Sequence, residues 1–356
     1  MKYRIIAMYL PQFHPTIEND EWWGAGFTEW TNVAKARPLF RAHYQPHIPA
    51  DLGFYDLRLP ETRQAQADLA SQYGIEGFCY WHYWFGNGRQ LLERPFSEVL
   101  KSGQPNFPFC LSWANHSWKK KLWSTDGSGD KLLIEQLYPG DDDIIKHFQH
   151  LLPAFKDPRY VRVNNKPLFG VFAPLEHPNM RSFIDIWNRL AIENGLDGIY
   201  FVGHGDIRNR EKILALGFDA FNDVTMFGIL HNENPIRQIW MKVRARLLGW
   251  PITYRYKDAM KYWCHNEARL TNTIPSIFPN WDHSPRSGKK GIILTDANPK
   301  LFREHVTDVL ELIENKPFEE RLVFIKSWNE WGEGNHMEPD LKYGRGHLEA
   351  LFDCVK

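Results

Sequence analysis

The chain has 356 residues, 43% of them apolar, with 43 basic and 43 acidic side chains. The zero net charge offers no overall electrostatic attraction for a nucleic-acid polyanion, so we expect no nucleic acid among the ligands. Four scattered cysteines without CxxC spacing favour neither a disulfide framework nor a zinc site.

The chain opens with "MKYRIIAMYLPQFH", in which a short apolar run ends at Pro11. A bilayer span needs roughly 18 to 20 apolar residues, and a signal peptide has a different pattern. We therefore expect a strand here, no transmembrane segment and a cytoplasmic protein.

Short apolar runs recur along the chain, each followed by polar and aromatic residues. Their hydrophobicity is continuous and not alternating, which is typical of strands covered on both faces, as in parallel sheets. The predicted strands are 4–14, 77–88, 107–118, 166–174, 198–206, 217–224, 274–286 and 321–334.

Helical patterns lie between these strands, at 61–74, 141–155, 180–195 and 298–316. Strand and helix alternating about eight times predicts an α/β protein with a single (β/α)8 (TIM) barrel. We expect one catalytic domain over residues 1–356, with long βα loops and insertions near 15–60 and 231–273.

The second insertion contains the basic, amphipathic stretch "IRQIWMKVRARLLGWP", residues 236–251. The ordinary interpretation is a solvated helix packed on the barrel. The alternative is peripheral membrane contact by an interfacial helix that touches anionic lipid or a lipid-linked sugar.

Aromatic residues are abundant, with 15 Trp, 14 Tyr and 23 Phe, and many stand beside His, Asn, Asp or Glu. Indole and phenol rings stack on the apolar faces of sugars while polar neighbours bind the hydroxyls. An oligosaccharide or polysaccharide is therefore the expected ligand.

In a (β/α)8 barrel the active site lies at the C-terminal ends of the strands, so the residues after each apolar run are the candidates. The histidines among them are dispersed, without HxH or HExxH spacing, so we expect hydrogen bonding to sugars, no metal and no cofactor. The candidates for substrate contact are His14, Trp81, His82, Tyr83, Trp84, Trp113, Asn115, His204, Asp223, Trp281, Asn329 and Trp331.

The last strand leads into "SWNEWGEGNHMEP", residues 327–339, which contains Glu330 and Glu333. A carboxylate pair is the usual equipment for cleaving a glycosidic bond, and its members normally come from different strands to flank the sugar. Two glutamates on one loop are expected on the same side of the ring. That arrangement suits substrate assistance, in which one protonates the leaving group and the other deprotonates a neighbouring sugar hydroxyl.

The segment "NEWGEGNHMEP" resembles the glutamate motif of glycoside hydrolase family 99, the endo-α-mannosidases and endo-α-mannanases. The whole chain is similar to the WbsX-type proteins, through "YLPQFHP", "GFCYWHYWF", "LSWANHSW" and "FKDPRYVRVNNKPLFGVFAP". The resemblance implies a (β/α)8 barrel and retaining, metal-independent cleavage of α-mannoside-like or related linkages through a 1,2-anhydro sugar. It also implies that Glu330 is the base and Glu333 the general acid/base.

Two alternatives remain open. WbsX-type proteins are often labelled glycosyltransferases of polysaccharide and O-antigen gene clusters, so one alternative is a transferase of cell-surface polysaccharide biosynthesis. A common sugar-nucleotide enzyme would show two doubly wound domains or a DxD motif. The run Asp141 to Asp143 heads a predicted helix and is interpreted as helix-start charge. The other alternative is a noncatalytic carbohydrate-binding barrel.

Overall fold

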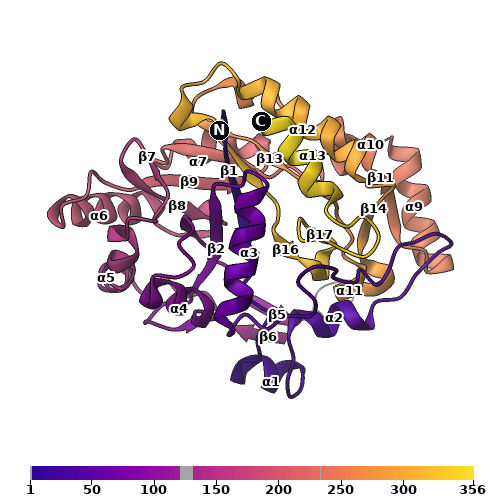
Figure 1. Cartoon of the computed structure of the whole chain (residues 1–356), viewed down its shortest axis with the longest axis horizontal. Helices are drawn as coiled ribbons and strands as arrows, with labels where there is room; N and C mark the ends of the chain where they lie inside the picture. The colour runs from indigo at the N-terminus through magenta and orange to yellow at the C-terminus, as the bar shows by residue number, and fades with distance from the viewer. Residues whose placement is uncertain (1, 121–130, 233) are drawn as a thin grey trace. The chain divides into compact units, whose positions relative to one another are not determined.

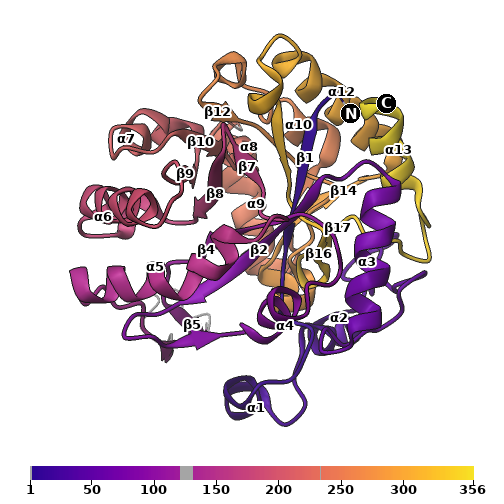
Figure 2. The same ribbon diagram turned by 60° about the vertical axis from the view of Figure 1, so that its left-hand side comes forward.

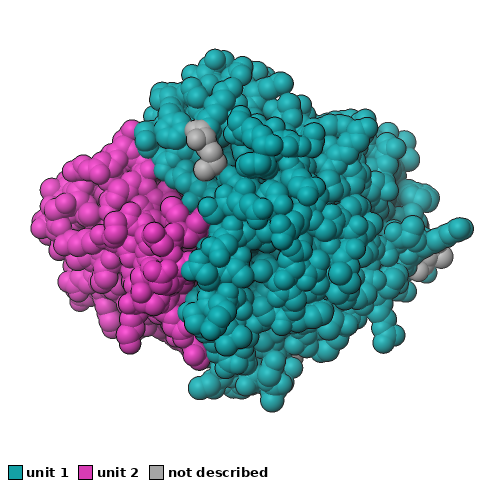
Figure 3. All heavy atoms as spheres, viewed as in Figure 1, with its two compact units in different colours: residues 1–78, 224–356 teal, residues 79–223 magenta. Residues whose placement is uncertain are grey.

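A computed structural model describes residues 2–120, 131–232 and 234–356 of the chain (Figure 1). Parallel strands alternate with helices, and the fold is the (β/α)8 barrel of the α/β class that the sequence predicted. The chain divides into two compact units, Met1–Phe78 with Val224–Lys356 and Cys79–Asp223 (Figure 3). The single catalytic domain stays a prediction.

Each predicted strand position holds a strand, and the seventh is interrupted at Pro275 into two short pieces. The barrel strands are β1 (Arg4–Tyr9), β2 (Gly77–Trp84), β4 (Phe109–Trp113), β8 (Lys166–Val171), β9 (Tyr200–Gly205), β10 (Ala220–Asp223), β12 (Thr273–Ile274) with β13 (Ser276–Ile277), and β15 (Leu322–Ile325).

In the first unit, β15 lies between β1 and β13, and all three are parallel, with Arg4 opposite Leu322 and Ser276 opposite Phe324. Every residue of β1 and β15 is buried, as continuous apolar runs predict for strands covered on both faces. The helices of this barrel portion are α3 (Pro60–Gln72), α12 (Pro299–Ile313) and α13 (Gly346–Val355), of which α12 and α13 lie side by side (Figure 1).

In the second unit, β2, β4, β8, β9 and β10 follow one another across the sheet. Its helices are α4 (Arg94–Ser102), α5 (Asp141–Lys156), α6 (Met180–Glu193) and α7 (Arg210–Leu214), and α5 and α6 lie side by side (Figure 2). The fully buried Trp187 of α6 packs against the rings of Phe155, Phe169 and Phe201, which joins the helices to the sheet. Short antiparallel strands complete this unit: β3 (Gln90–Leu91), β5 (Trp118–Lys120), β6 (Lys131–Ile134) and β7 (Arg162–Val163).

The four predicted helices, now α3, α5, α6 and α12, are confirmed, and local chemistry explains their starts. The Asn298 side chain accepts hydrogen bonds from the Lys300 and Leu301 backbone N–H groups at the start of α12. The acidic run beginning at Asp141 occupies the first turn of α5, where a helix N-terminus is positive.

The two predicted insertions contain structure of their own. Residues 15–60 hold α1 (Ile17–Trp23) and α2 (Glu29–Lys35). In the second insertion, β11 pairs with β14 (Ile292–Thr295) over a separate apolar cluster that includes Tyr256, Trp263 and Phe278. The remaining elements there are α8 (Gly228–Asn232), α9 (Pro235–Leu248), β11 (Ile252–Arg255) and α10 (Tyr256–Met260). Across the described residues, none of the helices combines the length and hydropathy needed to cross a membrane.

Candidate active site

The two glutamates of the last strand meet on a tight hairpin in the first unit. β16 (Asn329–Glu330) pairs antiparallel with β17 (Asn335–His336), and the turn between them contains Glu333. The carboxyl groups of Glu330 and Glu333 are hydrogen-bonded to each other. Their side chains are 9% and 14% exposed, respectively, so the pair is shielded from solvent yet reachable.

Gly334 ends the hairpin turn in the left-handed region, at φ +57°. A Cβ there would lie 2.8 Å from the Cβ of Asp282, whose backbone N–H donates to the Glu333 carbonyl over 2.6 Å. The turn that carries Glu333 therefore fits directly against Asp282, and only glycine allows this approach.

Substitution of Gly334 by Ala is expected to lower the free energy of unfolding by about 2–4 kcal/mol, the sum of left-handed strain and a steric clash. Gly344→Ala is the matched control, since Gly344 has φ +52° with no atom within 4 Å of the added Cβ. Chemical denaturation of both variants measures the difference. Equal losses would show that the approach to Asp282 costs nothing.

Arg286, on the short helix α11 (Ser284–Ser287), binds three carboxyl groups at once. Its Nη2 donates to Glu29 Oε2 over 2.5 Å, and its Nε lies 3.1 Å from the same oxygen. Its Nη1 donates to Glu333 and lies 3.9 Å from Glu330 Oε2. The planar guanidinium thus orients the glutamate pair against the buried Glu29 of α2.

This cluster contains three carboxyl groups and one guanidinium group. The excess of acidic groups contributes to the pKa shifts of its members. Burial raises the pKa of Glu330 to about 8, with the nearby charge of Glu333 adding to the effect. Burial also acts to raise the pKa of Glu29, but the ion pair with Arg286 outweighs it and the pKa lies below its ordinary value. Glu330 therefore keeps its proton near neutral pH, because burial and the nearby charge of Glu333 disfavour its ionisation.

Asp282 anchors the seventh-strand loop to the first insertion. Its Oδ2 accepts from His43 Nε2 and Gln45 Nε2, each over 2.7 Å. The Leu39 backbone N–H donates to His43 Nδ1, which assigns the ring proton to Nε2. Burial acts to raise the pKa of Asp282, but these hydrogen bonds outweigh it and the pKa is lowered. Asp282 is thus a charged support beneath the Glu333 turn.

Asn329 and Trp331 hold the glutamate hairpin in place. Asn329 Oδ1 accepts from the Leu10 backbone N–H over 2.7 Å, and the Trp331 indole N–H donates to Glu338 over 2.6 Å. Tyr55 also donates to Glu338, and burial raises the pKa of that carboxyl to about 7. Because these polar atoms are engaged within the protein, substrate contact by Asn329 and Trp331 stays a prediction.

Three donor groups beside the hairpin could hold a metal ion: His47, His336 and Asp340 are buried, with one ligand atom each within 4.8 Å of the others. His336 Nδ1 bonds the Glu338 carbonyl over 2.8 Å, which leaves Nε2 facing His47 Nδ1 at 2.9 Å. They line a cavity of about 540 Å³ together with Lys342, whose Nζ lies 4.6 Å from the Tyr44 ring centroid. No signal in the sequence marks this group, because His47 is 289 positions from His336 and further still from Asp340.

The other predicted site residues of the first unit are His14 and Trp281. His14 is buried after β1. Trp281 is half-buried and stacks on His283, whose Nε2 lies 3.8 Å from Glu333 Oε1. The Trp281 indole N–H is buried and, among the described residues, no hydrogen-bond partner of it is seen; its contact with substrate stays a prediction.

In the second unit, side chains alternate between the two faces of β2, so the predicted site residues of this strand lie on opposite sides of it. His82 Nε2 lies 2.8 Å from His147 Nε2 of α5, and Trp84 stacks on the same ring at 4.6 Å. The Trp113 indole donates to the Trp84 carbonyl. Trp81 points to the other side of β2, with its ring 5.9 Å from that of His204. His82, Trp84 and Trp113 therefore pack with α5.

His204 and Asn115 are tied into polar contacts of the second unit. His204 lies between Ser112 Oγ at 2.9 Å and Asn222 Oδ1 at 2.7 Å, next to the buried Asp223. Asn115 binds both the N–H and the carbonyl of Ala173, over 2.8 and 2.9 Å. Asn115 thus holds two strand ends together, and its role in substrate contact stays a prediction.

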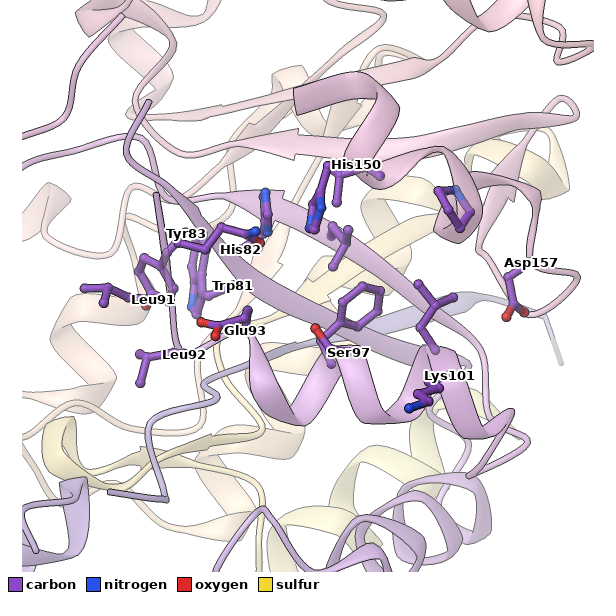
Figure 4. A pocket seen from close by; sticks show the side chains of 16 residues that line it. Trp81, His82, Tyr83, Leu91, Leu92, Glu93, Ser97, Lys101, His150 and Asp157 are labelled. Carbon is purple, nitrogen blue, oxygen red and sulfur yellow. The ribbon is translucent and has the colours of Figure 1, made fainter. Parts of the chain in front are cut away.

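A cavity of about 450 Å³ in the second unit is lined by Trp81, His82 and Tyr83 together with residues of α4 (Figure 4). Its two carboxylates, Glu93 and Asp157, lie at opposite ends of the cavity (Figure 4). These two carboxylates therefore do not form a pair in this cavity.

The fold is a (β/α)8 barrel, and a largely buried pair of glutamates follows its last strand. The chain belongs to the family described as Glycosyltransferase WbsX, whose model matches residues 5–351. The family resemblance that the sequence motifs carried is confirmed.

Comparisons with individual proteins agree with the fold. The chain is 36% identical over 355 residues to the uncharacterized protein WxcX of Xanthomonas campestris pv. campestris, covering 99% of this chain and 49% of the relative. It therefore spans about half the length of the curated relatives it matches. A solved GH99 endo-alpha-mannosidase from Bacteroides thetaiotaomicron has a TM-score of 0.59 at 14% identity, covering 99% of this chain and 95% of that one. A solved glycoside hydrolase-like protein has a TM-score of 0.61 at 17% identity, covering 99% and 94%.

Proposed function

We propose that this protein is a retaining glycoside hydrolase that acts on α-mannoside-like or related linkages of a polysaccharide. The observation that carries the proposal is the position of Glu330 and Glu333 on one hairpin, where Arg286 Nη1 approaches both carboxyl groups. The likeness in fold to an endo-alpha-mannosidase supports the choice of sugar.

The separation of the two carboxyl groups favours substrate assistance. Retaining enzymes with a carboxylate nucleophile hold their pair about 5–5.5 Å apart, and inverting enzymes about 6.5–9.5 Å apart. Glu330 and Glu333 lie on one hairpin, and Arg286 Nη1 approaches both carboxyl groups, so the two cannot flank a sugar ring from opposite faces. They can reach two neighbouring oxygens on one side of it.

In the first step, Glu330 removes the proton of the sugar 2-hydroxyl, and that oxygen attacks the anomeric carbon. The bond from the anomeric carbon to the leaving oxygen breaks as Glu333 protonates that oxygen, giving a 1,2-anhydro sugar. In the second step, Glu333 takes a proton from water, which opens the three-membered ring at the anomeric carbon, and Glu330 returns its proton to O2. Two inversions give net retention of configuration.

These roles require the single proton of the pair to reside on Glu333 when substrate is bound. The high pKa of Glu330 depends in part on the negative charge of Glu333. Transfer of the proton along the hydrogen bond between the carboxyl groups removes that charge and leaves Glu330 as the ionised base. The buried setting, which opposes ionisation, then makes Glu330 a stronger base than an exposed glutamate.

The pH dependence of kcat/KM follows from the loss of the proton that Glu330 holds in the free protein. Because the pKa of Glu330 is raised to about 8, this carboxyl group keeps its proton below that pH and loses it above. We expect kcat/KM on a glycan to be steady below about pH 8 and to fall tenfold per pH unit above it. Steady-state assays between pH 5 and 10 measure the profile, with thermal unfolding at each pH as the control. A rate that stays level to pH 10 in folded protein would contradict this role of the proton.

The activity itself is tested by incubation with α-mannoside-containing glycans, with reducing ends quantified and the anomeric configuration of the first product read by NMR. Release of product with retained configuration supports the proposal. A product of inverted configuration would exclude the two-step route.

The second candidate function is glycosyl transfer in cell-surface polysaccharide synthesis, which the name of the WbsX family favours. The same acid pair could deliver an activated sugar to an acceptor hydroxyl instead of water. Calorimetric titration with sugar nucleotides separates the two proposals: micromolar binding supports a transferase, and its absence together with glycan cleavage supports the hydrolase.

A further inference from the structure

The helix α9 of the second insertion presents an apolar stripe to solvent. Its residues Ile236, Ile239, Trp240, Val243 and Leu247 are 47% to 77% exposed. Single exposed apolar residues are ordinary, but a contiguous exposed set marks an interaction surface. In Figure 1 this helix lies at the edge of the first unit, beside β11.

The stripe follows helical geometry. At about 100° per residue, its five members fall within an arc of roughly 100° on one side of α9. Met241, on the opposite side, is buried in the apolar cluster with Tyr254 and Trp263. The inner face of the helix therefore packs on the protein, and the outer apolar stripe stays exposed to solvent.

Basic residues flank the stripe on both sides. The segment 235–248 contains Arg237, Lys242, Arg244 and Arg246 and no acidic residue. The Arg244 guanidinium lies 4.7 Å from the Trp240 ring centroid and 5.0 Å from that of Trp250. An apolar stripe that includes tryptophan and has cationic borders is the pattern of a helix lying in a lipid interface.

We propose that α9 docks this protein on a membrane surface rich in anionic phospholipid. The stripe enters the boundary between headgroups and acyl chains, and the flanking arginines pair with phosphate groups. A second copy of the chain is a poor occupant, because two such helices would bring like charges together. The stripe is also the convex side of one helix, whereas recognition of a partner helix calls for a groove.

Vesicle sedimentation tests the proposal on the full chain. With phosphatidylcholine vesicles containing 30% phosphatidylglycerol, we expect a partition coefficient at least tenfold above that for pure phosphatidylcholine, reduced by 0.5 M NaCl. The double variant Trp240→Ser with Leu247→Ser is expected to lose about a hundredfold in partition. Arg246→Glu is expected to lose about tenfold, since it reverses one bordering charge.

Ile192→Ser is the matched control, because Ile192 is an exposed isoleucine, 66% accessible, on another helix. It should partition like the parent protein, and all variants should keep the parent melting temperature. Equal partition of the double variant and the parent would overturn the proposal. So would concentration-dependent self-association that the double variant abolishes, since the stripe would then join two copies. Cleavage of a soluble glycan is expected to be unchanged in every variant, so loss of the proposed catalytic function would be recognised separately.

Discussion

Replacement of Glu333 by Gln is expected to slow cleavage of a natural glycoside by about 10²–10⁴-fold while sparing a glycosyl fluoride substrate. Glutamine cannot protonate the leaving oxygen of a sugar, but fluoride departs without a proton. Glu330→Gln is expected to slow both substrates, since the 2-hydroxyl must lose its proton whatever the leaving group. Initial rates of both variants on the two substrate types measure this split.

Glu338→Gln is the matched control, because Glu338 is a buried glutamate of the same hairpin region that accepts hydrogen bonds from Trp331 and Tyr55. Weakened support of the hairpin should affect both substrates equally and lower the melting temperature. If Glu333→Gln also slows both substrates equally, its role as the acid is wrong. If the fluoride rescues Glu330→Gln instead, the two roles are exchanged.

Loss of Arg286 is expected to have the largest effect on stability. Arg286→Met leaves Glu29, only 2% exposed, as an uncompensated buried charge, which typically costs about 3–5 kcal/mol of unfolding free energy. The double variant Glu29→Gln with Arg286→Met should recover most of that loss, because it removes both charges together. Urea unfolding of the two single variants and the double variant gives the coupling energy.

Arg58→Met provides the comparison for an exposed ion pair. Arg58 binds Asp56 at 2.6 Å, but the two side chains are 39% and 30% exposed. An exposed pair is worth about 0–1 kcal/mol, so this variant should remain close to the parent. An Arg286→Met loss no greater than the Arg58→Met loss would mean that Glu29 does not depend on the guanidinium.

The barrel could be predicted from the sequence because its strands are covered on both faces and read as unbroken apolar runs. Local signals also marked the helices, such as the acidic first turn that begins at Asp141. The same continuity conceals which side of a strand each residue occupies. For this reason the aromatic run of β2 was grouped as one set of ligand contacts, although His82 and Trp84 pack against α5.

The acid pair was visible in the sequence because its two members share one short motif. Its electrostatic partners were not, since Glu29 and Arg286 are 257 positions apart and no local pattern links them. The pairing of His43 with Asp282, 239 positions apart, is hidden for the same reason. These long-range ion pairs affect the protonation of the site. They can be identified only from the three-dimensional structure of the loops.

The three acids gathered around Arg286 leave this cluster with an excess of one negative charge when Glu330 holds its proton. Such a site should attract a ring bearing positive charge, whether the strained sugar at the moment of bond cleavage or a protonated amine of similar shape. The affinity for an iminosugar that stays cationic should therefore increase as the pH rises and Glu330 loses its proton. Inhibition would then grow in the pH range where turnover declines.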